Sequence, residues 1–223
     1  LLPVDFGPES IKSIQELDKI KTWFKDHLNL TLVHCIDPSA LTNSTYPEKR
    51  DEAMDKLVEV SHKHIPGSVL EFGSVTCEVL DEKVEFLHQD YFDDNGIDLV
   101  VMGTTGVEND EILATTQTAE HVSRHTGRYI IVPLKCYLTN LNRILICTDY
   151  GSEDPEDYRD FQTLADKNQA EIFVVHVNTT GEPLTTFQEH NKRLLEGFLS
   201  TSNTTFHEIH ATDVIESVNG FAK

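Results

Sequence analysis

The residues with the clearest capacity for chemistry are two glycines, Gly103 and Gly106, which directly follow an unbroken apolar run from Leu99 to Met102. A run that is apolar on both faces is typical of a buried strand in a parallel sheet. Glycines between such a strand and a helix let the backbone approach a ligand, with free N–H groups directed at an anion. The stretch therefore predicts an anion-binding turn, but G-x-x-G spacing by itself is a weak signal because many turns need glycine merely to turn.

Other chemical patterns are incomplete. His121 and His125 lie four residues apart on an expected helix, a spacing that suits a metal ion, but no third ligand is evident. His34 and His176 occupy equivalent positions in two expected strands, which favours a structural role. The sequence has neither the G-x-x-x-x-G-K-[S/T] of P-loop NTPases nor the G-x-S-x-G of α/β-hydrolases. We therefore expect no catalytic residues, no metal site and no enzymatic activity.

The charge of the chain restricts its partners. Its 38 acidic residues against 18 basic ones give a formal net charge of -20. Such a surface repels phosphate backbones and anionic membranes, so we expect neither nucleic acid nor membrane as a partner. None of the four cysteines forms a CxxC pair. Isolated cysteines of this kind are typical of small buried side chains, so we expect a reduced, cytoplasmic compartment.

Apolar periodicity predicts the elements that position the glycine turn. Strands are expected at 1–6, 30–36, 74–80, 99–102 and 129–134, and helices at about 8–28, 47–64, 83–95 and 112–125. Helical crossovers between successive strands predict an α/β fold with a doubly wound parallel sheet.

The pattern starts again after a polar linker at 135–142. Three matches occur in the same order: Asp5-Phe-Gly7 with Asp149-Tyr-Gly151, His34 with His176, and Glu78 with Glu208. They predict an internal duplication, with one domain at 1–138 and a second, incomplete repeat at 139–223. The second copy stops at Lys223, before an equivalent of the glycine turn, so we expect further residues, another chain or the first repeat to cover the open sheet edge.

These features resemble the universal stress protein (UspA-like) family in its tandem two-domain form. Val4-Asp5-Phe6 resembles the end of the family's first strand, Ile97–Gly106 its fourth strand and loop, and Ala119–Val122 the helix that follows. The resemblance implies an adenine nucleotide α-hydrolase-like fold with a five-stranded sheet in the order 3-2-1-4-5. Strands one and four then end side by side, at the switch point where open α/β sheets bind ligands.

The resemblance also implies a site for ATP. Its residues would be Asp5, Val33, Met102, Gly103, Thr104, Gly106, Thr116 and Gln117. The family pattern G-x2-G-x9-G-[S/T] is met at the first two glycines, but Thr116 replaces the third glycine and Gln117 the hydroxyl residue. Thr116 adds a Cβ where backbone should approach phosphate, and three carboxylates at 108, 110 and 111 would repel a triphosphate unless Mg²⁺ bridged them.

Two hypotheses of different classes follow. In the first, the chain is a stress-response or signalling module that acts through folding and dimerisation surfaces, with a partly degenerate nucleotide pocket and no required cofactor. In the second, it is an ATP-binding module, with or without Mg²⁺, that uses Gly103–Gly106 as a phosphate cradle with little or no hydrolysis. In either case we expect a homodimer or repeat–repeat pairing through the strand Tyr129–Leu134.

Overall fold

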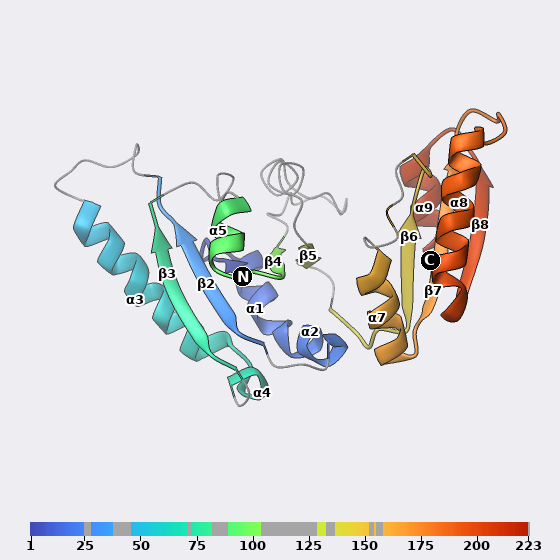
Figure 1. The fold of residues 1–223 in the computed structure, drawn as a ribbon. Helices are drawn as coiled ribbons and strands as arrows, with labels where there is room; N and C mark the ends of the chain where they lie inside the picture. Colours follow the sequence, from blue (N-terminus) through green and yellow to red (C-terminus); the bar gives the residue numbers. More distant parts are fainter. Residues whose placement is uncertain are drawn as a thin grey trace. The chain divides into compact units, whose positions relative to one another are not determined.

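The computed structural model describes residues 1–24, 28–37, 46–70, 73–81, 89–103, 129–132, 137–151, 154 and 158–222 (Figure 1). The chain divides into two compact units. Unit 1 comprises Leu1–Thr22 and Asp26–Thr139, and unit 2 comprises Trp23–Lys25 and Asn140–Lys223.

The described part of unit 1 alternates strands with helices, as the periodicity predicts. Its strands are β1 (Leu2–Pro3), β2 (Leu30–Cys35), β3 (Val75–Leu80), β4 (Val100–Gly103) and β5 (Tyr129–Val132). Its helices are α1 (Pro8–Gln15), α2 (Leu17–Phe24), α3 (Tyr46–His64), α4 (Gly67–Leu70) and α5 (Gln89–Asp94). The helix expected at 112–125 lies outside the described residues.

Both strand groups of unit 1 are parallel. One group has the order β1-β2-β3, with Leu2 opposite Leu32 and Leu30 opposite Val75. The other pairs β4 with β5, with Val100 opposite Tyr129. The α/β class and the parallel pairing are therefore as predicted.

Two backbone hydrogen bonds join these groups. The Leu1 nitrogen donates to the Leu99 carbonyl at 2.7 Å, and the Val101 nitrogen donates to the Leu1 carbonyl at 2.8 Å. In a parallel pair of strands, one residue bonds to two residues of the neighbouring strand that are two positions apart. The chain just before Asp5 therefore runs beside β4.

The helix expected from about 8 to 28 is wrong in one respect, because it is divided at Glu16 into α1 and α2. The carboxylate of Glu16 is buried and contacts the Lys12 ammonium at 2.5 Å. It also accepts a hydrogen bond from the Leu138 nitrogen at 3.1 Å. The break thus lies at a residue whose side chain is held by a segment far along the chain.

Unit 2 contains a second parallel sheet. Its elements are β6 (Arg143–Cys147), α7 (Arg159–Asn168), β7 (Glu171–Asn178), α8 (Thr186–Phe198), the 3-10 helix η4 (Leu199–Thr201), β8 (Thr204–His210) and α9 (Val214–Phe221). The strand order is β6-β7-β8, with Leu145 opposite Phe173 and Val175 opposite His207. One face of this sheet packs with α7 and α8 into a core that includes Ile146, Ile172 and Leu195.

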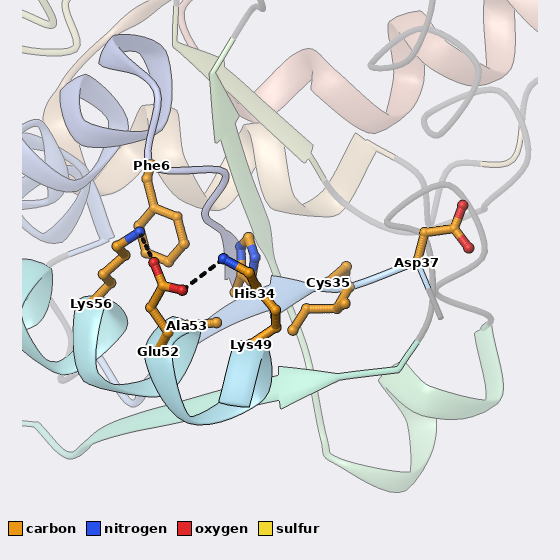
Figure 2. Close-up of a pocket in the computed structure, with 9 residues that line it drawn as sticks. Phe6, His34, Cys35, Asp37, Lys49, Glu52, Ala53 and Lys56 are labelled. Carbon is orange, nitrogen blue, oxygen red and sulfur yellow. Dashed lines mark hydrogen bonds and ion pairs between the residues drawn. The ribbon is translucent and has the colours of Figure 1, made fainter. Parts of the chain in front are cut away.

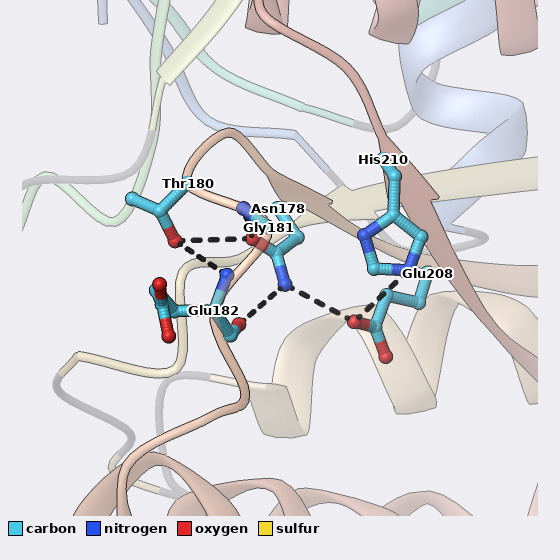
Figure 3. A network of polar contacts seen from close by, with 6 residues as sticks. All are labelled: Asn178, Thr180, Gly181, Glu182, Glu208 and His210. Atoms are coloured by element: carbon cyan, nitrogen blue, oxygen red, sulfur yellow. Dashed lines mark hydrogen bonds and ion pairs between the residues drawn. The ribbon is translucent and has the colours of Figure 1, made fainter.

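A polar network fixes the connection from β7 to α8 (Figure 3). The buried Asn178 amide oxygen accepts hydrogen bonds from the Gly181 nitrogen at 2.9 Å and from Thr180 Oγ1 at 3.2 Å. Its Nδ2 donates to the Glu182 carbonyl at 2.8 Å and to Glu208 Oε1 at 3.4 Å. Because all these contacts converge on one side chain, Asn178 holds the carboxyl ends of β7 and β8 together.

Within the described part of the chain, no helix is both long enough and apolar enough to cross a membrane.

Candidate ligand-binding site

A cavity of about 350 Å³ opens in unit 1 where β1 and β2 end (Figure 2). It is lined by Phe6, His34, Cys35, Ile36, Asp37, Lys49, Glu52, Ala53 and Lys56. Phe6 follows β1, the next four residues end or directly follow β2, and the last four come from α3. Open α/β sheets bind ligands beyond the carboxyl ends of their strands, and this volume is within the range of small-molecule sites.

The turn after β1 is held in an unusual backbone conformation. Asp5 Oδ1 accepts hydrogen bonds from the Gly7 nitrogen at 2.8 Å and from Ser10 Oγ at 2.7 Å. Between them, Phe6 has a φ of 64°, in the left-handed region that a bulky side chain rarely adopts. Such strain persists only where surrounding contacts impose it. The Asp5 carboxylate is one of those contacts, and the turn places the Phe6 ring at the cavity.

His34 supports the Phe6 ring from β2. The two ring centroids are 4.5 Å apart, with an angle of 37° between the planes. His34 Nδ1 lies 2.7 Å from the Val4 carbonyl oxygen. Because a carbonyl only accepts, Nδ1 carries the proton, and in the neutral ring Nε2 is then an acceptor. The contacts agree with the structural role expected for this histidine, and they also present a paired aromatic surface to the cavity.

Both lysines of the cavity pair with one carboxylate on α3, which offsets only one of their two positive charges. Glu52 Oε2 lies 2.8 Å from Lys49 Nζ, and Glu52 Oε1 lies 2.8 Å from Lys56 Nζ (Figure 2). These hydrogen bonds, with that to Lys49 first, lower the pKa of Glu52 to about 2. All three side chains are solvent-exposed, so a ligand anion would compete with Glu52 for both ammonium groups.

The residues predicted for the site are only partly brought together. Asp5 is exposed and precedes Phe6 at the cavity. Val33 and Met102 are buried in one apolar cluster with Leu1 and Val100, so their side chains belong to the core. Gly103 ends β4. The predicted residues Thr104, Gly106, Thr116 and Gln117 lie outside the described residues.

Gly103 is required for packing, whether or not it meets a ligand. A Cβ added at Gly103 would lie 2.7 Å from the carbonyl carbon, the oxygen and the Cβ of Glu9. Real Cβ atoms do not approach so closely, so the first turn of α1 fits against β4 only because residue 103 is glycine. The Glu9 carboxylate is also close to the Asp5 turn, since a Cβ at Gly7 would lie 3.3 Å from Glu9 Oε2 and 3.0 Å from Asp5 Oδ1. Two carboxylates therefore lie at this end of β1.

None of the described residues that line the cavity is among those predicted for the site. Lys49, Glu52 and Lys56 follow the i, i+3, i+7 spacing of one helix face, which signals an ion-paired face but not its orientation. Cys35 lies two residues after Val33 in β2, and it rather than Val33 lines the cavity. Val33 pairs with Pro3, the last residue of β1, so Cys35 lies beyond the end of that strand. The sequence alone does not show this register.

Unit 2 contains a turn with the same contacts. The Gly151 nitrogen donates to Asp149 Oδ1 at 2.7 Å, and Tyr150 has a φ of 55°. His176 Nδ1 donates to the Thr148 carbonyl at 3.0 Å, and the His176 and Tyr150 ring centroids are 5.1 Å apart.

The environment of this second turn differs, because α8 closes over it. Gln188 Nε2 donates to the Asp149 carbonyl at 2.9 Å, and Asn191 Nδ2 donates to the Tyr150 carbonyl at 2.9 Å. Tyr150 is buried as a result. In unit 1, the described helix after β2 instead leaves a cavity beside Phe6.

Comparisons with known proteins support the fold. No model of a known protein family matches the chain, and no curated protein matches it in sequence. The structure is similar to a universal stress protein from Archaeoglobus fulgidus DSM 4304, with a TM-score of 0.67 and 16% identity over 95% of this chain and 77% of that one. It is also similar to a functionally unknown protein from Pseudomonas aeruginosa PAO1, with a TM-score of 0.53 and 14% identity over 92% and 72% of the two chains. The chain therefore has an α/β fold of the kind found in a universal stress protein.

Proposed function

We propose that the protein is a universal stress protein-like module for stress response or signalling in the cytoplasm, whose nucleotide pocket is partly degenerate. Its function is then carried by its folded surfaces. The observation that supports this proposal is the close packing of Gly103 on the backbone of Glu9, because a glycine expected to cradle phosphate is engaged by a helix instead.

Electrostatics favour the same conclusion. The Glu9 carboxylate lies at the end of β1, close to Asp5, which the resemblance assigns to the nucleotide site. Each negative charge about 4 Å from a phosphate costs about 1 kcal/mol in water and about 4 kcal/mol near a protein surface. The cavity's two ammonium groups, Lys49 and Lys56, are already paired with Glu52. Triphosphate binding without a bridging metal ion is thus disfavoured.

The proposal includes a tandem architecture. The hydrogen bonds of Leu1 to Leu99 and Val101 support one five-stranded sheet in unit 1, in the order 3-2-1-4-5. The matching turns at Asp5 and Asp149 support a second copy of the same fold in unit 2. The similarity to the Archaeoglobus fulgidus protein extends over 95% of this chain, which is also consistent with a tandem form.

Assembly and compartment are further parts of the proposal. We expect a homodimer, or repeat–repeat pairing, through the strand that includes β5, for which the described part of unit 1 offers a hydrogen-bonded partner on only the β4 side. A reduced compartment suits Cys35, Cys77 and Cys147, all of which are free thiols. Light scattering tests whether two chains form a dimer. A monomer at micromolar concentration would leave only the pairing of the two repeats within one chain.

A second function, ATP binding, is favoured by one observation. The Phe6 and His34 rings line a cavity of small-molecule size, and a purine ring could stack on such an aromatic surface. In this alternative, Gly103–Gly106 would hold the phosphates and hydrolysis would be slow or absent.

Thermal unfolding with Mg-ATP separates the two functions. A ligand at a hundred times its dissociation constant adds about 2.7 kcal/mol of stability. We expect no shift at millimolar Mg-ATP and no release of inorganic phosphate. A saturable shift that Gly106→Val abolishes and Gly67→Val retains would establish the ATP-binding function instead. Gly67 is a suitable control because a Cβ there meets nothing within 4 Å.

A further inference from the structure

The cavity of unit 1 has an aromatic and apolar wall. The Phe6 and His34 rings both line it, with their centroids 4.5 Å apart. Ile36 and Ala53 line it as well, and the short side chain of Ala53 leaves room on the side of α3. A flat ring that enters the cavity can therefore stack on Phe6 in the offset arrangement that aromatic pairs prefer.

The side of the cavity formed by α3 has a surplus of positive charge. Lys49, Glu52 and Lys56, here called the lysine–glutamate group, contain two ammonium groups and one carboxylate. The pKa of Glu52 is lowered to about 2 by its hydrogen bonds, with that to Lys49 first, so the carboxylate is charged at neutral pH and one positive charge remains. An ammonium group has three N–H donors, and Glu52 accepts one from each lysine. The other N–H groups can bind a second anion.

The opposite side of the cavity is negative. Asp37 also lines the cavity, and it lies well away from the lysine–glutamate group, with Cys35 between them (Figure 2). A carboxylate there repels a second negative charge on a ligand and accepts a hydrogen bond from a donor. The volume of about 350 Å³ is at the lower end of the range for small-molecule sites. A ligand that fits is therefore small and carries negative charge at one end only.

We propose that this cavity binds a small aromatic monocarboxylate, with its ring on Phe6 and its carboxylate on Lys49 and Lys56. A neutral ring lacks the attraction to the lysine–glutamate group, and a dicarboxylate of the same size meets Asp37. One site per chain is expected, because α8 closes over the matching turn of unit 2 at Tyr150. The ligand goes beyond the proposed function, which requires none.

The direct probe is para-hydroxybenzoate, whose hydroxyl group can donate towards Asp37. We would titrate it into the whole protein and follow the NMR signals of the His34 ring, which an aromatic ligand on Phe6 should shift. A dissociation constant of about 1 mM is expected for so small a ligand. Terephthalate, with a second carboxylate, and phenol, with none, have the same ring, and each should bind at least about fivefold more weakly.

Charge variants of α3 should change the affinity in opposite directions. Glu52→Gln adds one positive charge to the lysine–glutamate group, so para-hydroxybenzoate should bind about fivefold more tightly, the effect of one charge at about 4 Å in water. Lys56→Met removes the surplus charge and should weaken binding about fivefold. Glu59→Gln is the matched control, since Glu59 is exposed on the same helix and does not line the cavity. A damaged fold explains a loss of binding but not a gain.

Phe6→Gly tests the aromatic wall. Phe6 has a φ of 64°, which glycine adopts without strain, so the turn should be kept while the ring is lost. Binding should weaken about fivefold, as expected for the loss of one aromatic pair.

Three results would overturn the proposal: no saturation at about ten times the expected dissociation constant, equal binding of phenol, or equal affinity of Glu52→Gln, Lys56→Met and the wild type. The Mg-ATP experiment tests the proposed function separately. Binding of para-hydroxybenzoate together with a Mg-ATP shift would support this site and overturn the proposed function. Binding of neither compound would overturn this site alone.

Discussion

Substitution of Gly103 by alanine should destabilise unit 1 even in the absence of any ligand. The added methyl group would lie 2.7 Å from the carbonyl carbon, oxygen and Cβ of Glu9. Two of these atoms belong to the backbone, so no side-chain rotation relieves the overlap. Helix α1 must move away from β4, or β4 must shift, and either movement disturbs the turn at Asp5 that follows β1.

The magnitude follows from the cost of an added group in a packed site, which is about 1–3 kcal/mol. Alanine also reduces the entropy of the unfolded chain by about 0.4–1 kcal/mol relative to glycine, and this effect acts in the opposite direction. The overlap is with fixed backbone, so we expect the packing cost to prevail. A net loss of about 1–2 kcal/mol in the free energy of unfolding of unit 1 is the expected result.

The assay must distinguish the two units, because a chain with two units does not have a single two-state transition. Hydrogen exchange at increasing urea concentration, followed by mass spectrometry, reports the opening of each segment separately. Peptides from α1 and β4 should lose protection at lower urea in Gly103→Ala, whereas those from β7 and α8 should not change. Gly67→Ala is the matched control, because a Cβ at Gly67 meets nothing within 4 Å.

Unchanged protection of α1 in Gly103→Ala would refute the reasoning. It would mean that α1 does not pack on the end of β4, and that Gly103 is free to approach a ligand. Loss of protection in Gly67→Ala as well would show that glycine replacement in unit 1 is generally harmful, and the specific overlap would then explain nothing.

Three other changes test contacts elsewhere. Asn191→Leu removes the donor to the buried Tyr150 carbonyl, so unit 2 should lose about 1–3 kcal/mol of stability, measured by the same exchange experiment. Lys49→Met removes the first cause of the lowered pKa of Glu52, so the NMR titration midpoint of this carboxyl should rise from about 2 towards its ordinary value. Lys12→Met leaves the Glu16 carboxylate buried without its cation, with the Leu138 nitrogen as its one donor among the described residues, so unit 1 should lose about 3 kcal/mol in urea unfolding.

The direction of the Glu52 effect follows from linkage. A lowered pKa in the folded state means that the two ammonium groups favour the charged carboxylate. The stability contributed by this pairing is therefore complete above the ordinary carboxyl pKa of 4.5 and is lost as the pH falls through about 2. A Glu52 midpoint that stays at its wild-type value in Lys49→Met would contradict the ion pairs. Wild-type stability of Asn191→Leu or Lys12→Met would likewise show that the deleted contact is replaced by water.

The elements with the strongest periodicity could be predicted from the sequence. The expected strand at 30–36 and the expected helix at 47–64 agree with β2 and α3 to within one residue. Gly96, which follows the helix expected at 83–95, has a φ of 60° just after α5. These features depend on local patterns, namely alternation, an apolar stripe and a residue that tolerates positive φ, so neighbouring residues suffice to specify them.

Features that depend on distant contacts could not be predicted in the same way. The break at Glu16 coincides with a hydrogen bond from Leu138, which no pattern within the helix announces. The cavity lies at the end of β1, next to the predicted residue Asp5, but none of the predicted site residues that the structure describes lines it, and four of its nine lining residues come from α3. Which face of α3 covers the cavity depends on how the helix packs on the sheet, and periodicity alone does not orient Lys49, Glu52 and Lys56 towards Phe6.

The two turns differ in whether a cavity lies beside them. Asp5-Phe6-Gly7 and Asp149-Tyr150-Gly151 share a carboxylate–amide hydrogen bond, a left-handed aromatic residue and a supporting histidine. One turn borders a cavity, and the other is closed by amide side chains of α8. The shared motif therefore belongs to the fold, since it persists without an open site. The helix after the second strand of each unit decides whether a ligand can enter, so functional assignment in this chain should depend on α3 and α8 rather than on the motif.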